Sequence, residues 1–135
     1  MSRMRMLSAP LLLLGALGCG NDLRVYPVSG RIVLADGDIS RIGEAFIILE
    51  SETEPKFRGD ARLQPDGRFE VQMLHHGRVL HGIPAGKYRA KIQFEDTGAS
   101  RAQLPVKRQV TDFATSGLSI NVPAENDIVF TVTRK

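Results

Sequence analysis

The chain has 135 residues, of which 42% are hydrophobic and 24% are charged, and it contains one cysteine and no tryptophan. This length fits one domain with one core, and a single cysteine excludes a fold that depends on intrachain disulfides. The formal net charge of +3 is small and no segment concentrates Lys and Arg, so we do not expect nucleic acid as a partner.

The N-terminus has the parts of a secretory signal. Arg3 and Arg5 precede an apolar core at residues 7–17, which is shorter than the roughly 20 residues needed to span a bilayer. Residues 16–19, with the sequence ALGC, resemble the lipobox of bacterial lipoproteins, although leucine is preferred at its first position. The resemblance implies cleavage before Cys19, attachment of diacylglyceryl to its sulfur, and acylation of the new amino group by a chain such as palmitate. An ordinary signal peptide with an incidental cysteine is the alternative.

The expected domain organisation follows from this resemblance. It consists of a lipoprotein signal peptide at residues 1–18, a lipidated tether at 19–24 and a β domain at 25–135. Two of the 18 basic residues leave with the signal, so 16 remain against 15 acidic residues and the mature chain is nearly neutral. Gly20 occupies the position where aspartate would indicate inner-membrane retention. We therefore expect a cell-envelope protein held in a membrane by Cys19, more readily the outer than the inner one.

Short segments with the two-residue alternation of β-strands follow the tether, and turn residues separate them. Residues 45–49 form a continuous apolar run, which is typical of a strand buried on both faces. Residues 64–68 carry Pro, Asp and Gly in turn order and predict a hairpin. Residues 88–95 alternate most regularly, which excludes an amphipathic helix there. The expected strands lie at 28–34, 45–49, 61–64, 69–73, 88–95, 118–122 and 128–132.

About seven such strands without a helical stripe predict an all-β fold, specifically a seven-stranded antiparallel β-sandwich whose two inner faces share one core. The periodicity fails between residues 98 and 116, so a long irregular connection is expected there. The expected core includes Ile32, Ile48, Phe69, Val71, Ile92, Phe94, Ile120 and Phe130.

Four short segments, taken in order, resemble the carboxypeptidase regulatory-like, or transthyretin-like, domain. The stretch 114–118 with the later Val122-Pro123 is also similar to small bacterial lipoproteins that consist of this domain alone. The resemblance implies a non-catalytic sandwich. A hydrolase branch of the fold has an early histidine and a C-terminal Tyr-Arg-Gly-Ser, and both are absent here, so we do not expect an enzyme. The four segments are residues 27–32, 43–47, 66–69 and 84–89.

All three histidines lie within residues 75–81, which raises the question of a metal site. Zinc needs three or four ligands that converge on one point. His75 and His76 are adjacent and would point to opposite faces of a strand, although Gly77 leaves room for one of them to approach His81. We interpret the segment as a polar loop between two strands and expect no metal or other cofactor. No calcium loop or nucleophile elbow is present either, so no catalytic residue is expected.

Two classes of function remain. The first is a lipid-anchored, non-catalytic structural or protein-interaction module of the cell envelope. The second is a binding module for an extracellular glycan or small ligand, but such sites display exposed aromatics and only Tyr26 and Phe113 are candidates. The first class is therefore favoured. The irregular connection is the expected partner-binding loop, because long loops on rigid scaffolds often carry binding. Its basic and aromatic residues, which suit an acidic partner surface, are Arg101, Lys107, Arg108 and Phe113.

Overall fold

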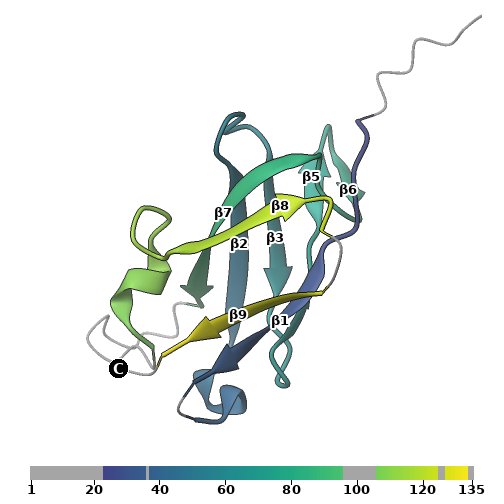
Figure 1. Ribbon diagram of the computed structural model, residues 1–135. Helices are drawn as coiled ribbons and strands as arrows, with labels where there is room; N and C mark the ends of the chain where they lie inside the picture. Colours follow the sequence, from purple (N-terminus) through teal and green to yellow (C-terminus); the bar gives the residue numbers. More distant parts are fainter. Residues whose placement is uncertain (1–22, 36, 96–105, 125–126, 134–135) are drawn as a thin grey trace, which may run out of the picture.

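The computed structural model describes residues 23–35, 37–95, 106–124 and 127–133, and within these ranges the chain is all-β (Figure 1). No helix in the described ranges has the length and apolar character needed to cross a membrane. The 3-10 helices η1 (Ile39–Ile42) and η3 (Arg108–Thr111) accompany the strands. The strands are β1 (Ser29–Leu34), β2 (Ala45–Ser51), β3 (Arg58–Arg62), β4 (Arg68–Glu70), β5 (Met73–His75), β6 (Arg78–Leu80), β7 (Gly86–Phe94), β8 (Leu118–Val122) and β9 (Ile128–Val132).

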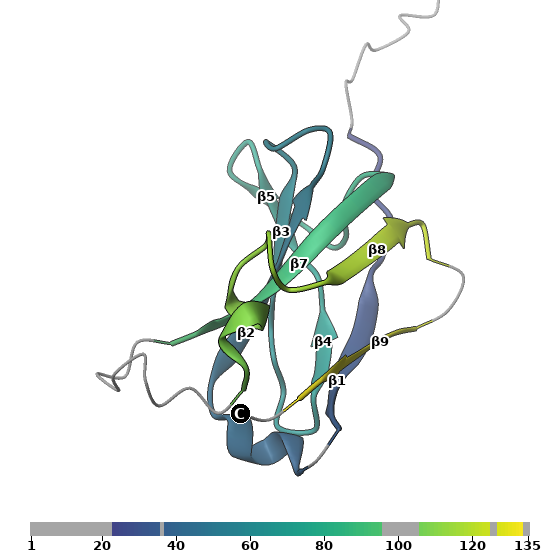
Figure 2. The ribbon, with the colours of Figure 1, turned by 60° about the vertical axis from the view of Figure 1, so that its left-hand side comes forward.

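Two larger sheets face each other in Figures 1 and 2. One has the strand order β3-β2-β7-β8 and is antiparallel throughout, with Ile47 opposite Ile92. The other has the order β4-β1-β9. Here β1 pairs with β4 in antiparallel fashion but with β9 in parallel, which places Ile32 opposite Phe130. Uniform antiparallel pairing was therefore a wrong expectation. A third, two-stranded sheet consists of β5 and β6.

The core lies between the two larger sheets, because each strand turns alternate apolar residues inward. Tyr88 is its largest fully buried side chain, and the rings of Phe69 and Phe130 stack with their centroids 6.2 Å apart. Phe94 is half-buried and packs against the core from its margin. The other expected residues that belong to the core are Ile32, Phe69, Val71, Ile92, Ile120 and Phe130.

Ile48 was expected in the core, but it does not belong to the core cluster. In β2 the positions that face the core are those of Ile47 and Leu49, so Ile48 between them points to the outer face of the sheet. Its side chain is nevertheless buried. The apolar run at 45–49 is thus buried on both sides, as expected, but only one side belongs to the core.

Two segments expected to be irregular have regular structure. The histidine segment forms the hairpin of β5 and β6 instead of a polar loop. The described part of the long connection, from residue 106, contains η3 with the buried side chain of Val110. In Figures 1 and 2 the hairpin lies at the same end of the molecule as the first described residues, and η1 lies at the opposite end.

Candidate functional site

The outer face of the sheet β3-β2-β7-β8 carries five basic side chains, and we call these five the basic face. Strands β3 and β7 flank β2 and turn every second residue outward. On this outer face, Lys91 of β7 lies opposite Ile48 of β2, and Arg89 of β7 lies opposite Glu50 of β2. The basic face consists of Arg58, Arg62, Lys87, Arg89 and Lys91.

Phe113 lies over the basic face and is half-buried there. The centre of its ring is 4.8 Å from Lys91 Nζ, 5.4 Å from Arg89 Cζ and 5.7 Å from Arg58 Cζ. Each of these distances is within the range of a cation–π attraction, which is worth roughly 0.5–1 kcal/mol at an exposed site. One aromatic ring therefore gathers three positive charges from two strands that are not adjacent.

The turn that carries Phe113 is fixed to β7 by a side-chain hydrogen bond. The hydroxyl of Ser116 donates to the carbonyl oxygen of Ala90 in β7, and it accepts a bond of 3.2 Å from the amide of Leu118. Within the turn, Asp112 Oδ1 accepts from the amide of Ala114 at 2.9 Å, which is the local bonding that favours aspartate in turns. These bonds, together with the buried Val110 of η3, explain why the ring is held against the sheet.

The positive charge near Phe113 is only partly neutralised. Among the described residues, Lys91 and Arg58 form no ion pair with a carboxylate. The Nε atom of Arg89 is buried and lacks a hydrogen-bond partner. An unsatisfied buried donor of this kind is uncommon and costly. The remaining basic side chains are paired: Arg89 with Glu50 at 3.0 Å, Arg62 with Glu44 at 2.9 Å and Lys87 with Glu52 at 3.7 Å.

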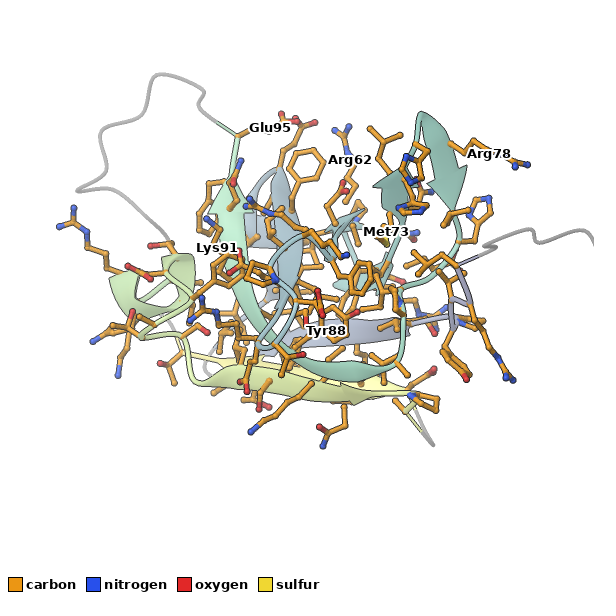
Figure 3. The ribbon with its side chains drawn as sticks, turned by 90° about the horizontal axis from the view of Figure 1, so that it is seen from above. Arg62, Met73, Arg78, Tyr88, Lys91 and Glu95 are labelled. Atoms are coloured by element: carbon orange, nitrogen blue, oxygen red, sulfur yellow. The ribbon has the colours of Figure 1, made fainter. Side chains whose placement is uncertain are left out.

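A pair of carboxyl groups adjoins the basic face at the Arg62 end, where Figure 3 shows Glu95 and Arg62. A side-chain hydrogen bond with Glu95 lowers the pKa of Glu44, and the charge of Arg62 lowers it further. The same hydrogen bond raises the pKa of Glu95. Glu44 is exposed and Glu95 is half-buried. Because the pKa of Glu95 is raised, the pair keeps a proton to a higher pH than a lone carboxyl group does, and its titration changes the charge beside the basic face.

Of the site residues predicted from the sequence, Phe113 lies at the basic face. Cys19 and Arg101 lie outside the described residues. Lys107 and Arg108 are exposed at the start of η3, and neither belongs to the cations around the ring of Phe113. The three cations that do surround it were missed, since they are contributed by β3 and β7. The alternation of 88–95 showed that Arg89 and Lys91 share a face, but it gave no sign that Phe113 folds onto them.

The histidines lie in and beside the β5–β6 hairpin: His75 ends β5, His76 is in the turn, and His81 follows β6. The rings of His75 and His76 are in edge contact, with centroids 4.1 Å apart, while His81 is exposed beyond β6. Within the described ranges, no group of three or more His, Cys, Asp or Glu side chains is placed to hold a metal ion. Tyr26, the other aromatic candidate, is half-buried, and Arg24 Cζ lies 5.2 Å from its ring centre.

No family model matches the chain, and no curated protein or solved structure matches it. The features from which a function can be inferred are therefore the basic face around Phe113 and the lipobox-like segment that ends at Cys19.

Proposed function

We propose that the protein is a lipid-anchored, non-catalytic component of the cell envelope that binds an acidic partner protein through the basic face. The anchor is Cys19, and the outer membrane is its favoured location. The observation that carries the binding proposal is the cluster of Lys91, Arg89 and Arg58 around Phe113. Arginine and aromatic side chains are the residue types that contribute most to protein interfaces.

The electrostatics of the cluster support an acidic partner. Lys91 and Arg58 have no carboxylate partner among the described residues, so their charges are available to a ligand. A carboxylate of a partner placed beside Lys91 would neutralise charge that this chain leaves unpaired. Complementary charge of this kind speeds association and selects partners more than it adds affinity.

The fold supports the same class of function. The two larger sheets together contain seven strands, which fits a β-sandwich of the carboxypeptidase regulatory-like, or transthyretin-like, type with the β5–β6 hairpin as an addition. Such a sandwich offers a rigid outer face, and a rigid face loses little conformational entropy on binding.

A glycan-binding or small-ligand-binding module is the alternative. The observation that favours it is that Phe113 is aromatic and only half-buried. Three cations surround the ring, however, and a sugar stacks on an open aromatic face. An uncharged glycan is therefore a poorer match to this surface than an acidic protein.

The anchor is tested by Cys19→Ser in cells supplied with labelled palmitate. We expect the variant to lose the label and to leave the membrane fraction, because serine offers no sulfur for the diacylglyceryl group. Unchanged labelling and membrane retention would contradict the proposed anchor.

The basic face is tested by crosslinking in intact cells with Lys91→Glu, and Arg31→Glu is the matched control. Arg31 is an exposed arginine on the outer face of the other sheet, so its reversal changes the net charge equally. We expect Lys91→Glu to reduce the yield of captured partner about tenfold or more, as expected when a close charge pair becomes repulsive. Equal yields from the two variants would exclude the basic face as the contact surface, and selective binding to a glycan array would favour the alternative.

A further inference from the structure

The β5–β6 hairpin exposes a pair of apolar side chains. Leu74 is 70% exposed and Val79 is 55% exposed, the two highest values among the large hydrophobic residues of the described chain. The two residues lie directly opposite each other in the hairpin register, so they form one cross-strand pair on one face. On the other face Met73 is buried in the core. Leu74 and Val79, which we call the apolar pair, therefore project from a hairpin that is itself anchored.

The hairpin is held in a fixed position. His76 has φ 49° and Gly77 has φ 74°, the left-handed conformation at both central turn positions that matches the twist of a two-residue hairpin. Just before β5, Gln72 and Asp60 of β3 exchange two backbone hydrogen bonds of 2.8 and 2.9 Å. Leu74 and Val79 are thus exposed on a hairpin of defined conformation, not on an irregular loop.

The apolar pair lies close to the start of the β domain. Tyr26 and Ile83 exchange backbone hydrogen bonds of 2.8 and 3.1 Å, which ties the N-terminal segment to the chain just after β6. Leu23 already packs against the core. The four peptide units that join Cys19 to Leu23 can extend at most about 14 Å. A lipid on Cys19 therefore keeps this end of the domain near the bilayer.

The charges at this end suit an anionic membrane surface. Arg78 is exposed on the hairpin beside Val79, and Figure 3 shows its side chain directed away from the body of the domain. Arg24 is exposed as well. The acidic residues of the β2–β3 loop, which lies at the same end in Figures 1 and 2, are each paired with a lysine: Glu52 with Lys87 and Glu54 with Lys56. Exposed apolar residues with adjacent basic residues are the combination that binds the headgroup layer of anionic bilayers.

We infer that the β5–β6 hairpin inserts Leu74 and Val79 into the headgroup layer of the membrane that holds Cys19. This inference rests on the proposed lipid anchor and adds a second membrane contact to it. Two contacts fix the orientation of the domain, whereas one lipidated residue on a short tether leaves it free to rotate. The end with η1 then points away from the bilayer.

The test uses the mature lipidated chain in vesicles of phosphatidylethanolamine and phosphatidylglycerol that carry a quencher on the lipid. Lipidated Cys19 has no free thiol, so Leu74→Cys gives one position for an environment-sensitive fluorophore. Ser40→Cys, on exposed η1 at the opposite end, is the matched control. We expect the probe at position 74 to shift to the blue and to be quenched several-fold more strongly than the probe at position 40.

A second measurement removes the contribution of the fluorophore's own apolar character. The probe is placed by His81→Cys next to the hairpin, with or without the double substitution Leu74→Ser and Val79→Ser. We expect the double substitution to lower quenching at position 81 several-fold, while circular dichroism shows an unchanged fold. Equal quenching at positions 74 and 40 in a lipidated protein would overturn the inference and leave the anchor intact. A chain that carries no lipid and stays off the vesicles would contradict both proposals.

Discussion

At the scale of single residues, Tyr88 shows how the core places a polar group. Its ring is fully buried, and its hydroxyl donates a hydrogen bond of 2.8 Å to the carbonyl oxygen of Pro84. Burial raises the pKa of Tyr88 to about 12, because the phenolate would lose its hydration. The hydrogen bond fixes the start of β7 and thereby the strand that carries Arg89 and Lys91.

This pKa predicts a loss of stability in alkaline solution. The unfolded phenol ionises near pH 10 and the folded one near pH 12, so the folded state holds more protons between these values. The free energy of unfolding should therefore fall as the pH rises from about 10 to above 12, by up to about 3 kcal/mol from this group. Tyr88→Phe should flatten that slope and cost about 1–3 kcal/mol at neutral pH, since the carbonyl of Pro84 loses its donor. Urea unfolding across this pH range measures both effects, and an identical slope in the variant would contradict the assignment.

Gly30 is a position where the two strands of the parallel pair approach too closely for a side chain. A Cβ atom there would lie 2.2 Å from the carbonyl oxygen of Ile128, a backbone atom that cannot move without disturbing β9. We expect Gly30→Ala to lower the free energy of unfolding by about 1–3 kcal/mol. The neighbouring Arg31→Ala, at an exposed position, should change it by less than about 0.5 kcal/mol. Urea denaturation compares the two variants, and equal stabilities would show that no such contact limits residue 30.

At the scale of elements, the turn at residues 112–116 should depend on one hydroxyl. Ser116→Ala removes the bond to Ala90 and the acceptor for the amide of Leu118. We expect a loss of about 1 kcal/mol and faster hydrogen exchange at Leu118, because the turn then separates more readily from β7. Ser119→Ala, an exposed serine on β8, is the control and should leave exchange unchanged. If both variants exchange alike, the hydroxyl does not hold the turn.

Local alternation predicted the elements that have a strong local signal. The apolar positions of β1, β7, β8 and β9 are read directly from their period of two, and the structure confirms strands there. The β5–β6 hairpin was missed because its strands have only three residues and its turn is His76-Gly77, not the Asn-Gly or Asp-Gly that marks such turns.

Features that depend on distant parts of the chain were not predictable in the same way. The partner of β1 on its parallel side is β9, and nothing in either strand specifies that pairing. Ile48 was assigned to the core because an apolar residue in an apolar run gives no sign of which face it occupies. Phe113 was identified as the aromatic of the binding loop, but its cations come from β3 and β7, which are remote in sequence.

At the scale of the whole molecule, both larger sheets depend on the same core. Phe69 of β4 is buried and stacks on Phe130 of β9, and β1 lies between these two strands in the sheet. We expect Phe69→Ala to cost about 3–5 kcal/mol, a large share of the roughly 5–15 kcal/mol that stabilises a domain. Phe113→Ala, which removes an equal ring from the outer face, should cost far less.

Thermal unfolding followed by far-UV circular dichroism tests this prediction. The spectrum should show strand structure, and the melting curve should show a single cooperative transition. A reductant should not change the melting temperature, because the chain has only one cysteine. Equal melting temperatures for the two phenylalanine variants, or two separate transitions in the unaltered protein, would contradict a shared core.

The parallel pairing of β1 with β9 also determines when the domain can fold during synthesis. Ser29, at the start of β1, donates a side-chain hydrogen bond to Asp127, which lies 98 residues later and just before β9. The sheet β4-β1-β9 is therefore incomplete until the ribosome has added β9, and pairing over so long a separation is intrinsically slow. A nascent chain that ends before β9 lacks one edge of this sheet, so we expect the domain to complete its fold only after β9 has been added.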